Sequence, residues 1–104
     1  MNIKINGKDY LFKFKLSAAL IYCKMRKIEL WQMSKDMDKL NSGKATIEQI
    51  EIMRDFIYAG IKSCDENTKV KVNDITDELS DADFINGISK EMQGSFPEVD
   101  EKKK

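Results

Sequence analysis

The chain has 104 residues, 41% hydrophobic and 35% charged, which is the composition of one well-solvated globular domain. No apolar run approaches the roughly 20 residues that a membrane-spanning helix needs. Met1 is followed by Asn2, Ile3 and Lys4 rather than by the long apolar stretch of a secretory signal. We therefore expect a cytoplasmic protein without a membrane partner.

The formal net charge is zero, but the charges are unevenly distributed along the chain. Residues 1–30 contain seven basic and two acidic residues, whereas residues 65–101 contain three basic and eleven acidic residues. Two interpretations are open. The charges could simply solvate different faces, or they could attract another copy of the chain or a charged partner.

The first residues predict an antiparallel β-hairpin over 2–15. Its apolar residues alternate with polar ones, as in half-buried strands: Ile3, Ile5, Tyr10, Phe12 and Phe14. Asn6 and Gly7 both tolerate the positive φ of a type I′ turn, so strands are expected at 2–6 and 9–15. The aromatic face should pack on helices, because an isolated hairpin is only marginally stable in water.

Apolar periodicity predicts helices after the hairpin, over about 18–27, 31–40, 46–64, 73–79 and 81–92. The fold class expected is therefore α+β, helix-dominated, with an N-terminal antiparallel hairpin followed by four to five helices. Residues 1–92 should form a single domain, and residues 93–104 a flexible charged tail.

Several residues are expected to cap or pack these helices. Thr46 and Gln49 have the spacing of a capping box, and Gly60 indicates a close contact because glycine weakens a helix interior. Other candidate caps are Ser17, Ser80, and either Asn73 or Asp74. The expected inward residues of the first helix are Leu16, Ala19, Leu20 and Cys23. Those of the third are Ile50, Met53, Ile57, Ile61 and Cys64, with Ile47, Phe56 and Gly60 alongside.

The residues that carry most enzyme chemistry are missing from the sequence. There is no histidine, which removes the commonest general base and metal ligand. Cys23 and Cys64 are too far apart in sequence to indicate a zinc site, and no glycine-rich phosphate loop is present. We expect no catalytic residues, no cofactor and no metal, and hence a protein that is not an enzyme.

Nucleic-acid binding is a competing interpretation of the hairpin, because Lys4, Lys8, Lys13 and Lys15 lie close to aromatic residues. Strand alternation, however, places the aromatic side chains on the face opposite Lys13 and Lys15. The zero net charge and the acidic second half also disfavour a phosphate-rich partner.

Apolar contacts with a protein partner are expected from five residues. Trp31 is the only tryptophan and is either a core anchor or an interface anchor. Met33 and Met37 follow it, and methionine suits surfaces that receive variable apolar helices. Phe84 and Ile88 complete this set of candidate partner-binding residues.

The opening Ile3-Lys4-Ile5-Asn6-Gly7-Lys8-Asp9-Tyr10-Leu11-Phe12-Lys13-Phe14, followed by a helical body and an acidic C-terminal part, resembles the small tail assembly chaperones of long-tailed bacteriophages and prophages of Gram-positive bacteria. The resemblance implies a non-catalytic protein of the host bacterial cytoplasm. It would bind the tape measure protein, keep it soluble while the tail tube protein polymerises, and self-associate.

Members of that family often exist in two lengths through a programmed frameshift. Lys102, Lys103 and Lys104 require an adenine-rich coding stretch that could serve as a slippage site, or they could be a plain solvated tail. Two other functions also stay open at this point: a structural virion protein of the tail or head, and a small nucleic-acid-binding regulator.

Overall fold

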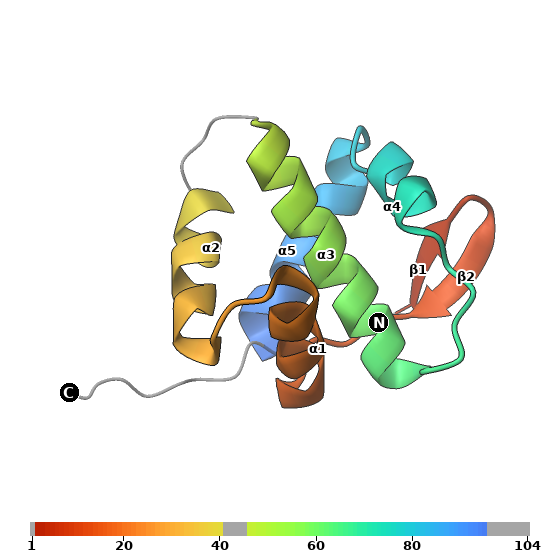
Figure 1. Ribbon diagram of the computed structural model, residues 1–104. Coiled ribbons are helices and arrows are strands. Elements are labelled where there is room, and N and C mark those ends of the chain that lie inside the picture. Colours follow the sequence, from red (N-terminus) through yellow and green to blue (C-terminus); the bar gives the residue numbers. More distant parts are fainter. Residues whose placement is uncertain (1, 41–45, 96–104) are drawn as a thin grey trace.

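The computed structural model describes residues 2–40 and 46–95 (Figure 1). Its elements, in chain order, are β1 (Asn2–Ile5), β2 (Lys8–Leu11), α1 (Leu16–Arg26), the 3-10 turn η1 (Leu30–Gln32), α2 (Met33–Leu40), α3 (Ile47–Cys64), α4 (Val72–Glu78) and α5 (Ala82–Ser95). An antiparallel hairpin thus precedes a set of helices, and the predicted helix-dominated α+β fold is confirmed.

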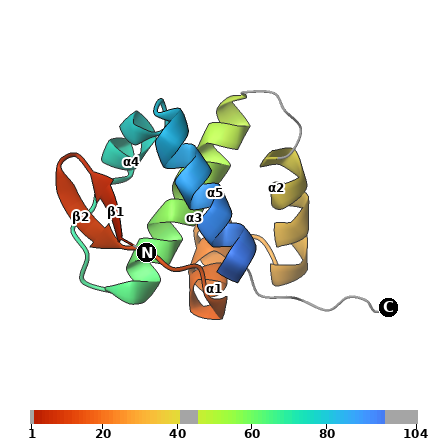
Figure 2. The ribbon, with the colours of Figure 1, turned by 180° about the vertical axis from the view of Figure 1, so that it is seen from behind.

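The long helix α3 is the centre of the molecule, and α1, α2 and α4 pack against it. The hairpin lies beside α4 and one end of α3, while α2 lies at the opposite side of the molecule (Figure 1). Seen from behind, α5 crosses α3 diagonally, from the neighbourhood of α4 toward α1 (Figure 2). Among the described residues, no helix is both long and apolar enough to cross a membrane.

The hairpin turns at Asn6 and Gly7, whose φ angles of 52° and 78° are the positive values that the sequence predicts. The backbone N–H of Asn6 also donates a hydrogen bond of 2.9 Å to the Glu78 carboxylate, which ties the turn to α4. The second strand ends at Leu11, so the prediction of a strand through residue 15 is wrong.

Burial of two aromatic rings explains where the second strand ends. Phe12 and Phe14 leave the ladder and become fully buried. Phe14 meets Phe56 of α3 edge to face, with ring centroids 5.0 Å apart. Phe12 lies over Gly60, where an added Cβ would stand 2.2 Å from its Cε1 atom. The predicted close contact at Gly60 is confirmed.

The predicted inward face of the first helix is partly wrong. Leu16 and Leu20 are 52% and 48% exposed, and the buried side chains of α1 are Ala18, Ala19, Tyr22 and Cys23. Two adjacent alanines let the α1 backbone come close to α3, and Tyr22 then stacks on Phe56 with ring centroids 4.1 Å apart. Large aliphatic side chains in that narrow interface would hold the helices apart.

The first turns of α3 also differ from the prediction. Ile47 and Ile50 are 78% and 41% exposed, whereas Ile57 and Ile61 are buried as expected. The buried face instead begins at Ile52 and continues through residues 55–57 and 59–61. The apolar stripe of the sequence is therefore longer than the face that the other elements cover.

The predicted capping box of α3 is confirmed: the Thr46 hydroxyl accepts a 3.1 Å hydrogen bond from the Gln49 N–H. Ser17 is not a cap, because α1 begins at Leu16 with Lys15 at the N-cap position. Asn73 and Asp74 are not caps either, since Lys71 takes that position in α4.

The prediction that Ser80 caps the last helix is wrong, because its side chain accepts no hydrogen bond from the first backbone N–H groups of α5. Its hydroxyl donates to the Asp77 carbonyl oxygen, and the Asp81 carboxylate accepts a 2.9 Å bond from the Asp83 N–H. At its other end, α5 continues to Ser95, so residues 93–95 of the predicted tail are helical. The rest of that tail, residues 96–104, lies outside the described residues.

Candidate partner-binding surface

Large apolar side chains are exposed at several places on the described part of the molecule. Those exposed by more than a third are Leu11, Leu16, Leu20, Met25, Trp31, Ile47 and Ile50. Single exposed apolar residues are normal on a protein surface, so exposure alone does not indicate a binding site. Two places are more informative: the outward side of α1, where two exposed leucines lie together, and the turn η1, which is held by its own capping box.

The outward side of α1 carries what we call the α1 stripe, which consists of Leu16 and Leu20. These residues are four apart and therefore lie on one face of the helix. Lys24 continues the same line after Leu20, and both Lys15 and Lys27 at the helix ends are exposed. The stripe is thus an apolar pair bordered by positive charge.

Trp31 projects from η1 and is 63% exposed. A capping box between Glu29 and Gln32 fixes this turn, because the Gln32 side-chain oxygen accepts a 2.7 Å bond from the Glu29 N–H. The Lys35 ammonium group lies 5.3 Å from the Trp31 ring centroid, within cation–π range. An exposed indole on an ordered turn is the type of anchor that protein interfaces use.

The other predicted partner-binding residues lie in different surroundings. Met33 and Ile88 belong to the core, with exposures of 2% and 0%, and Phe84 is partly buried against it. The side chain of Met37 lies outside the described residues. Of the five predicted residues, Trp31 is thus the one with a large exposed apolar surface among those described.

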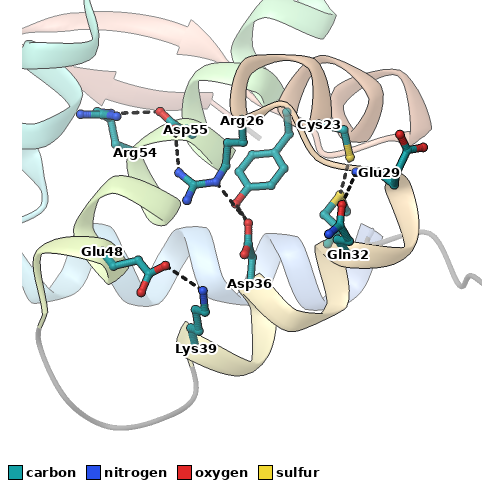
Figure 3. Close-up of polar contacts among 11 residues, drawn as sticks. Cys23, Arg26, Glu29, Gln32, Asp36, Lys39, Glu48, Arg54 and Asp55 are labelled. Carbon is teal, nitrogen blue, oxygen red and sulfur yellow. Dashed lines mark hydrogen bonds and ion pairs between the residues drawn. The ribbon is translucent and has the colours of Figure 1, made fainter.

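A mostly buried charged cluster links α1, α2 and α3 (Figure 3). We call it the Arg26 cluster, and it consists of Tyr22, Arg26, Asp36, Arg54 and Asp55. Arg26 of α1 reaches both carboxylates, with its Nη1 3.0 Å from Asp55 and its Nε 3.2 Å from Asp36. Arg54 reaches Asp55 over 3.0 Å, so the two arginines and two aspartates balance in charge.

Tyr22 completes the cluster from α1. Its hydroxyl donates a 2.5 Å hydrogen bond to Asp36, and its ring lies 5.7 Å from the Arg26 guanidinium carbon. Burial, and then the hydrogen bond to Asp36, raise the pKa of Tyr22 above its ordinary value. The phenol is therefore held neutral as a donor, and it is not poised to act as a base.

Burial also raises the pKa of the Cys23 thiol, which lies 3.8 Å from the Met33 sulfur. A buried thiol with a raised pKa is a poor nucleophile. Cys23 and Cys64 are both free. Among residues 2–40 and 46–95, no group of three or more Cys, Asp or Glu side chains could hold a metal ion.

The Arg26 cluster joins α1, α2 and α3 through ion pairs whose carboxylates are mostly buried. An exposed ion pair of 2.7 Å between Lys39 and Glu48, together with a hydrogen bond from the Gln49 side chain to the Lys39 carbonyl, adds a second link between α2 and α3.

The apolar periodicity of the sequence does not predict the Arg26 cluster, although one residue points to it. Asp55 falls on the apolar face of the third helix, between Ile52 and Phe56, where a solvated carboxylate is out of place. Its partner Arg26 is 29 residues away in the chain.

Comparison with protein-family models, with curated proteins and with solved structures finds no match to this chain.

Proposed function

We propose that this chain is a non-catalytic tail assembly chaperone of a phage or prophage, which binds the tape measure protein and keeps it soluble in the host bacterial cytoplasm until the tail tube protein encloses it. The observation that carries the proposal is Trp31, an indole that is 63% exposed on a turn fixed by its own capping box. The family resemblance of the opening residues supports it.

A helical client explains why such a surface would be useful. A long helical protein that exposes apolar residues aggregates unless a partner covers them. Trp31 and the α1 stripe of Leu16 and Leu20 offer apolar contacts of the kind that meet an amphipathic helix. Lysines around both places keep the free chaperone soluble and set the preference for the charge of the client.

The hairpin gives the nucleic-acid alternative little support. Phe12 and Phe14 are fully buried and are not available to stack on bases. The neighbouring Lys13 and Lys15 are exposed, but they follow the end of β2 at Leu11 and belong to no strand. For the structural virion alternative, the distinguishing observation is the presence of this chain in purified particles, from which a chaperone should be absent.

The direct test is co-expression of this chain with the tape measure protein of the same phage or prophage. The soluble fraction of the tape measure protein should rise in the presence of the wild-type chain. It should fall back by several-fold with Trp31→Ala, because truncation of an interface tryptophan weakens binding by about tenfold or more.

A matched control for this experiment is Leu11→Ala. Leu11 is 54% exposed on β2, across the molecule from η1 (Figure 1), and its truncation should leave the effect unchanged. No gain in solubility with the wild-type chain would contradict the proposed function. An equal loss with both variants would contradict the assignment of the surface at Trp31.

A further inference from the structure

The exposed Trp31 belongs to a unit that includes the helix after it. The turn η1 runs directly into α2, because the backbone N–H of Met33 donates to the Leu30 carbonyl oxygen. The Ser34 hydroxyl donates a 3.2 Å hydrogen bond back to the Trp31 carbonyl oxygen. Together with the capping box of η1, these bonds join residues 29–40 into one unit, which we call the lid. Any movement of α2 therefore carries Trp31 with it.

Backbone hydrogen bonds separate the lid from α1. The N–H of Ile28 donates to the Cys23 carbonyl oxygen over 3.0 Å, so Ile28 belongs to the end of α1. The N–H of Glu29 donates to the Gln32 side chain, so Glu29 belongs to η1. In the described part of the chain, no backbone hydrogen bond crosses from residues 29–40 to α1. The link between Ile28 and Glu29 can therefore act as a hinge.

Side chains hold the lid against α1. Among the described side chains of α2, only Met33 and Asp36 are buried. The Met33 sulfur lies 3.8 Å from the Cys23 sulfur. The Asp36 carboxylate accepts a 2.5 Å hydrogen bond from the Tyr22 hydroxyl and lies 3.2 Å from the Arg26 Nε (Figure 3). We call Tyr22, Arg26 and Asp36 the Asp36 latch, and both buried side chains of α2 thus contact α1.

The latch contributes less stability than the packing between α1 and α3. Removal of Asp36 and Arg26 from water costs much of the free energy that their attraction returns. Tyr22 stacks on Phe56 of α3 with ring centroids 4.1 Å apart, and this contact does not involve the lid. Opening of one element costs less free energy than unfolding of the whole chain. The interface of α1 with α3 can therefore stay intact when the lid moves away.

We propose that residues 29–40 open as a lid from α1 while the rest of the chain stays folded, and that the Asp36 latch sets how often the lid opens. Opening moves Trp31 to a new position and uncovers the apolar contact between Met33 and Cys23. The latch thus controls which apolar groups the protein presents. This inference goes beyond the proposed function, because the opening needs no tape measure protein.

Reaction of the two cysteine thiols with N-ethylmaleimide tests the proposal on the purified full chain. Cys23 is 6% exposed and should react only when the lid opens, whereas Cys64 is partly exposed and serves as the internal reference. Mass spectrometry of the labelled peptides gives a rate for each thiol. Asp36→Asn should speed the labelling of Cys23 by about tenfold or more, because it removes the charge that pairs with Arg26. The rate at Cys64 should not change.

Tyr22→Phe is a second variant of the latch, because it removes one hydrogen bond and keeps the stacking on Phe56. It should also speed the labelling of Cys23. Gly60→Ala is the matched control, since it weakens the fold where α3 meets Phe12, at the side of the molecule opposite α2 (Figure 1). Its labelling of Cys23 should match the wild type, because opening of the lid is more frequent than unfolding of the whole chain.

Labelling of Cys23 at the wild-type rate in both latch variants would overturn the proposal. Faster labelling of Cys23 in Gly60→Ala as well would also overturn it, because the thiol would then be reached only by unfolding of the whole chain. Equal rates for Cys23 and Cys64 in the wild type would show that no closed lid exists. Circular dichroism should show that all three variants are folded. None of these results bears on binding of the tape measure protein.

Discussion

Tyr22 places a hydroxyl group in the core, and its hydrogen bond to Asp36 should be measurable in stability. Tyr22→Phe keeps the stacking on Phe56 but removes the 2.5 Å bond, which leaves the buried Asp36 carboxylate short of a donor. The free energy of unfolding should fall by about 1–3 kcal/mol. Urea unfolding at neutral pH measures this loss.

The same residue predicts a pH dependence. The pKa of Tyr22 is raised in the folded chain above the value of about 10 for an unfolded tyrosine. The folded state therefore favours the neutral phenol. The contribution of Tyr22 to the free energy of unfolding is complete below about pH 10 and is lost as the pH rises further. Tyr22→Phe should show a smaller loss of stability than the wild type between about pH 10 and 11. Parallel alkaline losses would contradict this role of Tyr22.

Gly60 is the second residue whose replacement has a defined result. An alanine Cβ would stand 2.2 Å from Phe12 Cε1, and the Phe12 side chain is fully buried. Gly60→Ala should lower the free energy of unfolding by about 1–3 kcal/mol, although alanine is the better helix former.

A double-mutant cycle isolates the contact at Gly60. Phe12→Leu shortens the side chain that blocks the new methyl group. The combination with Gly60→Ala should therefore cost less than the sum of the two single substitutions. Strictly additive losses would show that the methyl group and the Phe12 ring do not meet.

At the scale of the elements, the Arg26 cluster determines how α1, α2 and α3 fit together. Arg26→Gln leaves Asp36 and Asp55 without their shared cation in a mostly buried setting, with side-chain exposures of 10% and 8%. Removal of one partner from such a cluster costs about 3–5 kcal/mol. Denaturant unfolding followed by far-UV circular dichroism measures this change.

Lys39→Ala is the matched control for the Arg26 substitution. It also breaks an ion pair between α2 and α3, but both partners are about half exposed, at 46% and 53%. Its effect on unfolding should be small, because water replaces the lost contact. Equal effects of Arg26→Gln and Lys39→Ala would contradict the structural role of the cluster.

Local sequence signals predicted the order of the elements well. The turn at Asn6 and Gly7 and the capping box at Thr46 depend on neighbouring residues only, and both are confirmed. The face of a helix that becomes buried depends on distant elements. Leu16 and Ile47 fit an apolar stripe, yet no described element covers them, because neighbours pack around Ala18 and Ile52 instead.

The candidate site was predictable only in part for the same reason. An exposed position for Trp31 was one of two alternatives that the sequence left open, and the structure shows it exposed. The burial of Met33 depends on how α2 rests against α1, and that placement is fixed by Arg26 and Asp36. Contacts between side chains of two different helices, such as these, leave no periodic signal in the sequence.

At the scale of the whole molecule, the proposed function uses the exposed apolar side chains at η1 and on α1. Trp31 on η1 would anchor an apolar helix of the tape measure protein.

The central claim is binding through Trp31, and its fluorescence tests this most directly, because Trp31 is the only tryptophan in the chain. The protein should be titrated with a tryptophan-free helical segment of the tape measure protein. The account predicts that the emission shifts to shorter wavelength and saturates as the indole leaves water. An unchanged emission spectrum, with or without formation of a complex, would contradict it.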